Sequence, residues 1–198
     1  MGNCTRCPDL VACRTQIVSP TPCHPGGILA IGEAPGADED RLGEGFAGRA
    51  GKTLDAILLE QGIPRDGYGR ANICRCRPPG NRHPSKAEAD ACLPLLSEFI
   101  AESNPGVLLL VGETAVAHFL GAGSLLRRIE QSRHPGGGWV VPEMCHPALS
   151  PVVRERGILA IPMPHTSGLA WNRKAPDGRR WSEIGRQQVA LAVSFVKR

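Results

Sequence analysis

A glycine-rich stretch near the start of the chain combines a group of four carboxylates, in its first part, with one aromatic side chain in its second part. Its first part, residues 32–40, reads GEAPGADED and follows the short apolar run 28–31, and its second part, residues 43–51, reads GEGFAGRAG. The carboxylates are Glu33, Asp38, Glu39 and Asp40. Phe46 has too many glycine neighbours for an ordinary core residue, and an aromatic ring beside an approachable backbone is suited to stacking a planar ligand. An acidic surface loop with one apolar anchor is the alternative interpretation.

Cysteine spacing indicates a metal ion or a metal cluster. The chain has eight cysteines, and because the cytosol keeps thiols reduced, we do not expect disulfides to account for them. Cys4 and Cys7 form a CxxC pair, which brings two thiolates to one ion or cluster and requires two further ligands. We expect these ligands to be Cys76 and Cys92. A CxxC pair is also found in zinc sites, in redox pairs and as unrelated thiols.

The other cysteines leave alternatives for the ligand set. Cys74 can take the place of Cys76, and we expect only one of the two to point toward a cluster. Cys13 and Cys23 belong to the same N-terminal segment as the CxxC pair and stay open as ligands. Cys145 is expected to be a buried apolar residue or a free thiol.

The apolar pattern predicts strands and helices in alternation, which must position these residues. Strands are expected at 28–31, 70–76, 107–111 and 158–163, with a short one at 139–141. Helices are expected at 51–62, 85–103, 112–120 and 181–196, and a loop-rich connection at 121–138. Ser85 and Glu88 have the spacing of a capping box at the start of the second helix.

Such alternation predicts an α/β protein with a central, mainly parallel four-stranded sheet and helices on both faces. In these sheets ligands bind at the carboxyl ends of the strands. The loops after Ile31, Ala71, Val111 and Met163 should therefore converge, and we expect the functional site there.

Composition is that of a cytosolic globular protein. With 198 residues, of which 41% are hydrophobic and 21% charged, we expect one well-buried domain over residues 1–198. The chain has no run of eighteen apolar residues and no apolar signal stretch at its start, which predicts a cytoplasmic protein without a membrane partner. The net charge of +4 permits a polyanionic partner without requiring one.

Several separate motifs resemble those of the family-4 uracil-DNA glycosylases. They are GEAPGADED, GFAGRAGKTLDAIL and NICRCRPPGNR, with the CxxC near the start and Cys92 in ADACLPLL, in the family's order over residues 1–120. The resemblance implies a three-layer α/β/α sandwich and the excision of uracil from DNA without a metal at the reaction centre. It also implies a structural 4Fe-4S cluster on Cys4, Cys7, Cys76 and Cys92, held by the N-terminal loop and the 76–92 segment.

The resemblance assigns roles to individual residues around the substrate. Glu33 matches the first acidic position, and Glu39 matches a second one that is associated with the catalytic water. Phe46 matches the aromatic residue that stacks on the flipped base, and Asn72 matches the asparagine that reads the uracil edge. Gly32 and Ala34, on either side of Glu33, belong to the same substrate-binding set.

The chemistry of base excision requires these residue types. A base inside a duplex has to be flipped out and held by stacking and by hydrogen bonds to its Watson–Crick edge. An amide side chain complements O4 and N3–H of uracil but meets the cytosine edge with the wrong pattern. As the glycosidic bond breaks, negative charge grows on uracil and positive charge on the sugar. The site therefore needs a histidine donor near O2 and a carboxylate, Glu33 or Glu39, near the sugar or the water.

Two histidines compete for the role of this donor. His165 follows the apolar run 158–163, where the family places its second motif, but Thr166 stands where that motif usually has proline. His146 keeps the order His-Pro but follows a poorer strand and lies farther from the closing helix. We favour His165 as the catalytic histidine and keep His146 as the alternative. The remaining histidines, which are His24, His83, His118 and His134, are expected on the surface or in helices.

We expect a monomer that acts on uracil-containing DNA, single- or double-stranded, in base excision repair. Phosphate contacts are expected from Arg77, Arg82 and Arg173, and a wedge near His165 from Leu169, Ala170 or Trp171. The segment 121–156 departs from the family pattern and leaves the preferred damaged base open.

Two other functions are compatible with the sequence. One is an iron–sulfur module of the same fold that binds nucleic acid without the chemistry, which the changed His-Thr-Ser motif favours. The other is a zinc protein whose GEAPG loop binds phosphate, although the carboxylates beside that loop would repel an anion.

Overall fold

A four-stranded parallel sheet forms the centre of the protein, which a computed structural model describes over residues 3–196. The strands are β1 (Ile28–Gly32), β2 (Gly69–Asn72), β3 (Val107–Val111) and β4 (Leu159–Met163), in the order β2-β1-β3-β4. The predicted α/β class and parallel sheet are confirmed. The two ends of the predicted domain, residues 1–2 and 197–198, lie outside the described residues.

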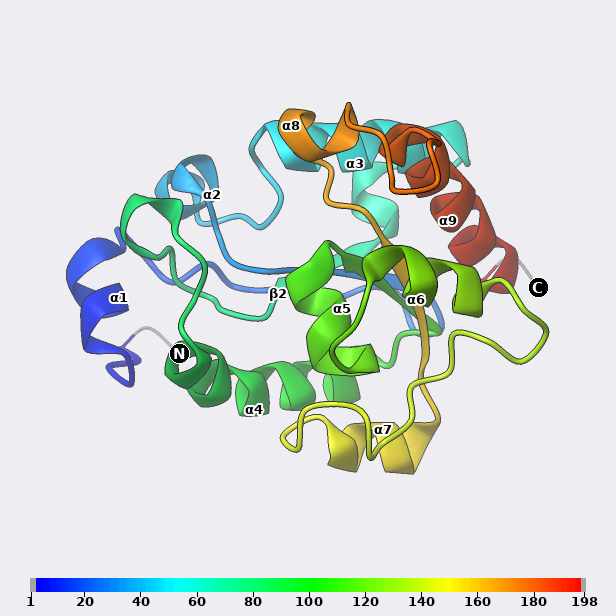
Figure 1. Cartoon of the computed structure of the whole chain (residues 1–198). Coiled ribbons are helices and arrows are strands. Elements are labelled where there is room, and N and C mark those ends of the chain that lie inside the picture. Colours follow the sequence, from blue (N-terminus) through cyan, green and yellow to red (C-terminus); the bar gives the residue numbers. More distant parts are fainter. Residues whose placement is uncertain (1–2, 197–198) are drawn as a thin grey trace.

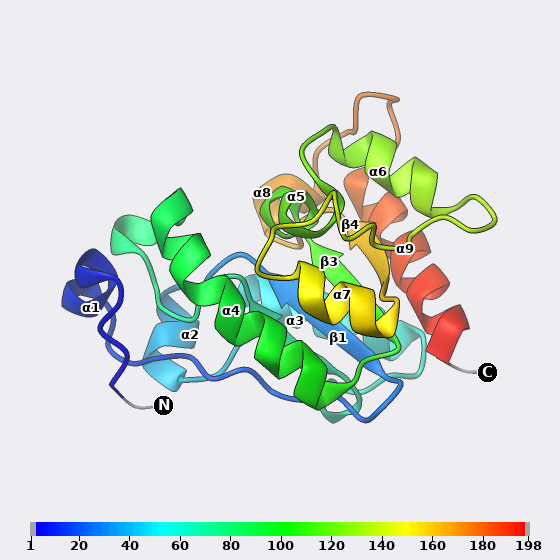
Figure 2. The ribbon, with the colours of Figure 1, turned by 90° about the horizontal axis from the view of Figure 1, so that it is seen from below.

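Helices cover both faces of this sheet (Figures 1 and 2). One face packs against α4 (Lys86–Ser103), α5 (Glu113–Leu120) and α7 (Ser150–Arg156), and the other against α3 (Arg49–Glu60) and α9 (Trp181–Val196). The shorter helices are α1 (Pro8–Cys13), α2 (Ala37–Leu42), α6 (Leu125–Ser132) and α8 (Gly168–Trp171), with 3-10 turns η1 (Arg65–Gly67) and η2 (Pro79–Asn81). Within residues 3–196, no helix has the length and apolar character needed to cross a bilayer.

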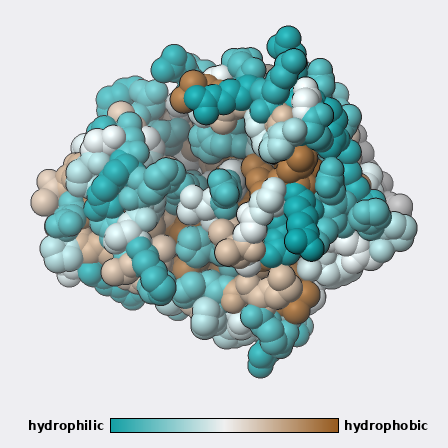
Figure 3. All heavy atoms as spheres, viewed as in Figure 1, coloured by the Kyte–Doolittle hydropathy of each residue, from teal (hydrophilic) through white to brown (hydrophobic). Residues whose placement is uncertain are grey.

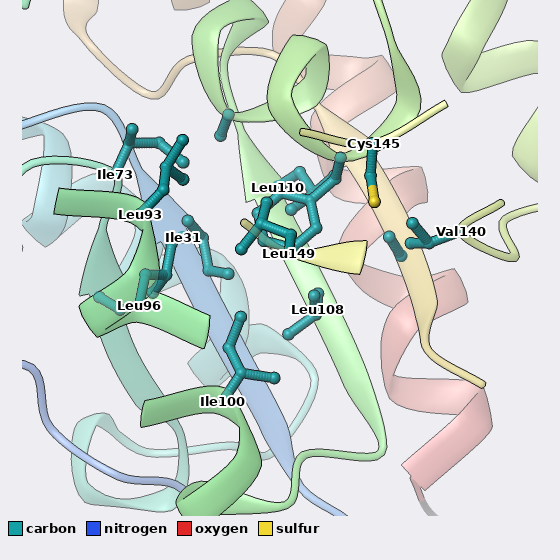
Figure 4. Close-up of a cluster of buried hydrophobic side chains, with 14 of the residues drawn as sticks. Ile31, Ile73, Leu93, Leu96, Ile100, Leu108, Leu110, Val140, Cys145 and Leu149 are labelled. Carbon is teal, nitrogen blue, oxygen red and sulfur yellow. The ribbon is translucent and has the colours of Figure 1, made fainter. Parts of the chain in front are cut away.

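The strands β1, β3 and β4 are apolar along their whole length because they face two helical layers, whereas the edge strand β2 contains Arg70 and Asn72. Ile31, Leu108 and Leu110 pack among the residues of α4, α5 and α7 (Figure 4), whereas Ile28 and Leu109 pack among those of α3 and α9. Successive side chains of a strand point to opposite faces, so a sheet buried on both sides requires continuous hydrophobic runs rather than alternation. This explains why the apolar runs of β1, β3 and β4 were visible in the sequence.

The start of α4 is fixed by the predicted capping box. Ser85 Oγ accepts a hydrogen bond from the Glu88 N–H at 3.3 Å, and Glu88 Oε2 accepts one from the Ser85 N–H at 2.6 Å. Arg82 donates to both oxygens of Glu88 at 2.8 Å, and this hydrogen bonding lowers the pKa of Glu88 to about 2 although burial opposes the shift. The cap therefore ties the 76–85 segment to the helix that carries Cys92.

Four predicted elements differ from the structure. The acidic segment after β1 is not a loop, because residues 37–42 form α2, and the predicted loop at 121–138 contains α6, whose Leu125, Leu126 and Ile129 pack on Ile184. The predicted strand 70–76 ends at Asn72. The segment 139–141 contributes only an isolated bridge between Trp139 and Leu159. The two helices were predicted as loops because their surroundings are rich in glycine. Residues 73–76 and 139–141 were predicted as strand because they are locally apolar, although the chain there is irregular.

Candidate active site

A cavity of about 1080 Å³ opens at the carboxyl ends of the strands, as predicted. Each strand or the turn after it contributes to the lining, through Gly32, Asn72, Val111 and His165. Figure 3, viewed from the same side as Figure 1, shows a mostly hydrophilic surface with small separate hydrophobic patches. The cavity lining combines charged and polar side chains, such as Glu33 and Asn72, with the apolar side chain of Phe46.

Phe46 and Asn72 meet above Gly32 in this cavity. A Cβ atom on Gly32 would lie 2.5 Å from Asn72 Oδ1 and 2.8 Å from the Phe46 ring, so only glycine lets both side chains approach the end of β1. Phe46 is 7% exposed and also belongs to the core cluster with Leu54, so the view that it is no ordinary core residue is correct only for the side that lines the cavity. Its backbone has φ of +56°, which is uncommon for a non-glycine residue.

Glu33 is held by two side chains that the sequence did not predict as site residues. The Thr114 hydroxyl donates a short hydrogen bond to Glu33 Oε2, and His83 Nδ1 lies 2.9 Å from both carboxylate oxygens. The His83 side chain is 88% exposed, as expected of a surface residue, yet it lines the cavity. Thr114 lies three residues after the end of β3, and that position was its only signal in the sequence.

Glu39 uses both carboxylate oxygens on the backbone. Oε2 accepts from the Gly36 N–H at 3.1 Å, and Oε1 accepts from the Gly48 N–H at 2.8 Å. Glu39 therefore joins the two glycine-rich segments while it also lines the cavity. Asp40 is buried and accepts the Thr15 N–H at 2.9 and 3.0 Å, which gives that carboxylate a structural role away from the cavity.

His165 lies in the cavity just beyond β4. The Ser167 N–H donates to His165 Nδ1 at 3.1 Å, so the proton of the neutral ring belongs on Nε2. The protein packed around the ring lowers the pKa of His165, and the negative charge of Glu33 opposes this shift. Gly112, at φ of +92°, would place a Cβ atom 3.3 Å from the ring and so leaves it room. His165 is thus a largely neutral donor at neutral pH.

His146 does not line the cavity. Its Nε2 lies 2.9 Å from Asp90 Oδ1 on α4, and its backbone N–H donates to the His118 carbonyl at 2.7 Å. His118, whose ring centroid lies 6.0 Å from that of His146, lines the cavity and directs Nδ1 toward the Thr114 carbonyl at 2.7 Å. Of the two histidines considered for catalysis, only His165 lies beside Glu33.

The four predicted ligand cysteines come together at one end of α4. Burial raises the pKa of Cys7, and the charges of Cys92, Cys4 and Cys76 raise it further, which places all four thiols in one electrostatic group. Arg14 Nη1 donates to Cys76 Sγ at 3.1 Å, and the Arg75 N–H donates to Cys92 Sγ at 3.4 Å. Hydrogen bonds of this kind stabilise thiolates.

These thiols have the chemistry that an iron–sulfur cluster requires. Among residues 3–196, no group of three His, Cys, Asp or Glu side chains is arranged to hold a metal ion. In a four-iron cluster each of the four cysteine thiolates binds a different iron. The donor set of four cysteines with N–H donors on two sulfurs therefore fits an iron–sulfur cluster.

Of the other cysteines, Cys74 lies among the predicted ligands, whereas Cys23 and Cys145 have separate surroundings. Cys74 is buried beside Cys92, and their hydrogen bond lowers the pKa of Cys92. Cys23 Sγ lies 3.7 Å from the Ser103 carbonyl at the far end of α4. Cys145 is buried, as predicted, with Sγ 3.2 Å from the Pro142 carbonyl.

The residues expected to contact DNA differ in their exposure and in whether they already have hydrogen-bond partners within the protein. Arg82 is paired with Glu88, and Arg77 Nε donates to Asn81 Oδ1 at 2.7 Å, whereas Arg173 is exposed in the turn after α8. Leu169 on α8 is 71% exposed, but Trp171 is buried. Leu169 is therefore the large apolar side chain that α8 presents to solvent, close along the chain to the cavity residue Ser167.

Comparisons with known proteins agree with this geometry. The model of the uracil DNA glycosylase superfamily matches residues 22–185. The chain is 40% identical over 118 residues to the type-4 uracil-DNA glycosylase of Thermotoga maritima, which is 60% of this chain and 61% of that protein. It is 38% identical over 110 residues to the enzyme of the same name from Pyrobaculum aerophilum, 56% of each chain. The Archaeoglobus fulgidus protein of that name is 36% identical over 113 residues, 57% of this chain and 56% of its own. The matches thus span less than two thirds of these relatives.

Proposed function

Because the chain belongs to the uracil DNA glycosylase superfamily, we propose that it removes uracil from DNA by hydrolysing the N-glycosidic bond, the first step of base excision repair. One observation carries the proposal: a single cavity contains a stacking ring, an amide, an ionisable carboxylate and a histidine donor. Cavities for small ligands measure about 300–1,000 Å³. A hollow at the top of this range has room for a flipped base with its sugar.

Recognition of uracil rests on Phe46 and Asn72. The flipped base stacks on the Phe46 ring, and the Asn72 amide pairs with O4 and N3–H of uracil. The same amide meets the cytosine edge with a donor facing a donor, so normal cytosine is rejected. Gly32 and Ala34 border this part of the cavity and leave the base access to the end of β1.

Charge separation in the reaction is stabilised by His165 and Glu33. The neutral His165 ring donates Nε2–H toward uracil O2, where negative charge grows as the glycosidic bond breaks. The Glu33 carboxylate, oriented by Thr114 and His83, stabilises the positive sugar or accepts a proton from the attacking water. The proposal keeps Glu39 at the position associated with the catalytic water, and the Gly36 and Gly48 N–H groups hold its carboxylate in place.

We assign Cys4, Cys7, Cys76 and Cys92 as the ligands of a 4Fe-4S cluster. When bound, the cluster supplies a covalent cross-link between the N-terminal segment and the start of α4, and no step of base excision involves it. Arg14 and the Arg75 backbone support the proposal, because they provide hydrogen bonds to two of the sulfurs.

The partner in this proposal is uracil-containing DNA, single- or double-stranded, bound by a monomer in the cytoplasm. Exposed Arg173 contacts backbone phosphate, and Leu169 enters the base stack at the position that the flipped nucleotide leaves. A wedge of this kind matters only where a stacked duplex has to be opened.

Strand cleavage by alkali at a single uracil in a labelled oligonucleotide tests the proposal. His165→Ala is expected to lower the rate by about 10²–10³-fold, the cost of removing one oxyanion donor, whereas His146→Ala serves as the matched control and keeps the wild-type rate. Leu169→Ala should slow duplex cleavage more than single-strand cleavage.

Three results would contradict parts of this proposal. If His146→Ala lost the activity and His165→Ala kept it, the hydrogen-bond donor would be His146, outside the cavity, and the assignment of His165 would be wrong. Wild-type protein that binds uracil-containing DNA tightly without cleaving it would be a binding module of the same fold. If Leu169→Ala had equal effects on duplex and single-stranded substrates, Leu169 would not act as a wedge.

A further inference from the structure

We propose that Arg65 is a positioning residue that holds Phe46 in the conformation in which its ring faces the cavity. Arg65 lies in η1, between α3 and β2, and does not line the cavity. The inference rests on the proposed function, because Phe46 is the residue that stacks on the base there. Arg65 reaches the substrate only through Phe46.

The backbone of Phe46 needs an external support. Its φ of +56° lies in the left-handed region, which an L-residue with a large side chain adopts only when its surroundings impose it. A Cβ atom on Gly51 would overlap the Phe46 carbonyl, so α3 packs directly on this peptide. Helix α3 thus restricts the Phe46 backbone from one side. On the other side, the Phe46 carbonyl needs a hydrogen-bond partner.

Arg65 provides that partner. Its Nη1 donates to the Phe46 carbonyl at 3.0 Å, and its Nη2 donates to the Gly45 carbonyl at 3.2 Å. The same guanidinium binds Asp55 of α3 at 2.8 and 3.0 Å. It also binds Glu44 at 2.8 and 3.2 Å. One side chain therefore connects the segment 44–46 to α3.

A second layer of hydrogen bonds fixes Arg65 itself. Tyr68 donates its hydroxyl to Asp55 Oδ1 at 2.6 Å, and Arg70 Nη1 donates to the Arg65 carbonyl at 2.6 Å. Tyr68 and Arg70 are buried. The hydrogen bond from Arg65 lowers the pKa of Glu44, so this ion pair persists at neutral pH. The network is consequently a rigid support rather than a mobile surface pair.

Lysine cannot reproduce these contacts. The planar guanidinium addresses two carbonyls and two carboxylates in fixed directions, whereas an ammonium group is a single point of charge. Arg65→Lys therefore keeps the charge and removes the geometry. Arg186→Lys is the matched control, because Arg186 pairs with Glu60 at 3.1 Å on the α3 and α9 surfaces and has no contact with the 44–46 segment.

A double-mutant cycle between Arg65 and Phe46 tests the proposal on single-stranded uracil DNA. Phe46→Ala is expected to lower kcat/KM by about 5- to 150-fold, the range for loss of one base–aromatic stack. Arg65→Lys should lower kcat/KM and weaken inhibition by free uracil, but have no further effect when Phe46 is already alanine. Arg186→Lys should leave both measurements unchanged.

Hydrogen exchange of residues 44–51 provides a readout that does not depend on activity. Exchange should become faster in Arg65→Lys and stay unchanged in Arg186→Lys. If Arg65→Lys does not fold, Glu44→Gln removes one partner of the guanidinium and should give a smaller change in the same direction.

The outcomes separate this inference from the proposed function. An active wild type with an Arg65→Lys penalty that is the same in both Phe46 backgrounds, or with no penalty, would overturn the inference alone. An inactive wild type would overturn the proposed function. In that case hydrogen exchange would still test the inference, because unchanged exchange in Arg65→Lys would show that Arg65 does not support Phe46.

Discussion

At the residue scale, His165 illustrates how one backbone contact sets the chemistry of a side chain. The Ser167 N–H occupies Nδ1, and the surrounding protein disfavours the charged ring, so Nε2–H is left as the donor. A neutral donor suits a site that also contains the negative Glu33, because it can stabilise charge on the leaving base without forming a permanent ion pair with the carboxylate. The role of the histidine thus depends on its tautomer as well as on its position.

The lowered pKa of His165 predicts a dependence of stability on pH. Below the ordinary value of 6.5 the unfolded chain binds a proton that the folded chain binds less well, so the free energy of unfolding falls as pH decreases through the lower folded pKa. His165→Gln should show a shallower decline. Urea denaturation between pH 5 and 8 measures both, with the surface variant His134→Gln as control. Parallel curves for wild type and His165→Gln would contradict the prediction.

At the scale of elements, α4 connects two parts of the site. Its capped start fixes the segment that includes His83, and its first two turns carry Cys92 and Asp90, the partner of His146. The position of α4 therefore affects the carboxylate that we assign to catalysis and the cysteines that we assign to the cluster. A change at the cap should therefore affect both this carboxylate and these cysteines.

The capping box gives a measurable prediction for this element. Ser85→Ala should lower the free energy of unfolding by about 1 kcal/mol, because the Glu88 N–H loses its acceptor. Glu88→Gln keeps a capping oxygen but loses the ion pair with Arg82. Since the pKa of Glu88 is lowered from 4.5 to about 2 by Arg82, the contribution of its charge is present above pH 4.5 and is lost as pH falls through 2.

Urea denaturation at pH 7 and pH 3 checks both variants. The stability difference between wild type and Glu88→Gln should be smaller at the lower pH. Glu98→Gln, an exposed position on the same helix, is the control. A Glu88→Gln penalty that grows at pH 3 would mean that the Arg82 pair does not stabilise the folded state.

At the scale of the whole molecule, the four cysteines that we assign to the cluster come from separate parts of the chain. Cys4 and Cys7 precede α1, Cys76 follows β2, and Cys92 lies in α4. A cluster on these residues would therefore join segments that lie far apart in the sequence. Its loss should loosen the N-terminal part of the protein.

Two cysteines near the ends of α1 test this. Cys7→Ser should lower the iron content and the absorbance near 400 nm, and should lower Tm by at least about 4 °C, which corresponds to 1–2 kcal/mol in a protein of this size. Cys13→Ser should change none of these. Iron analysis and thermal unfolding monitored by circular dichroism measure the effects. Iron lost from Cys13→Ser but retained by Cys7→Ser would reassign the ligand set.

The sequence by itself determined the positions of β1, β3 and β4, the capped α4, the closing helix and the edge of the sheet at which the predicted site residues lie. These features follow from local patterns: continuous apolar runs, the Ser85–Glu88 spacing and motifs placed directly after strands. It did not reveal α2 or α6, because both are short helices set among many glycines. Tertiary structure alone decided the pairing of Glu33 with His83 and Thr114, the use of Glu39 on the backbone, and the location of His165 rather than His146 in the cavity. These outcomes depend on contacts between side chains 50 and 81 residues apart, and on packing that excludes one histidine, neither of which leaves a periodic signal in the chain.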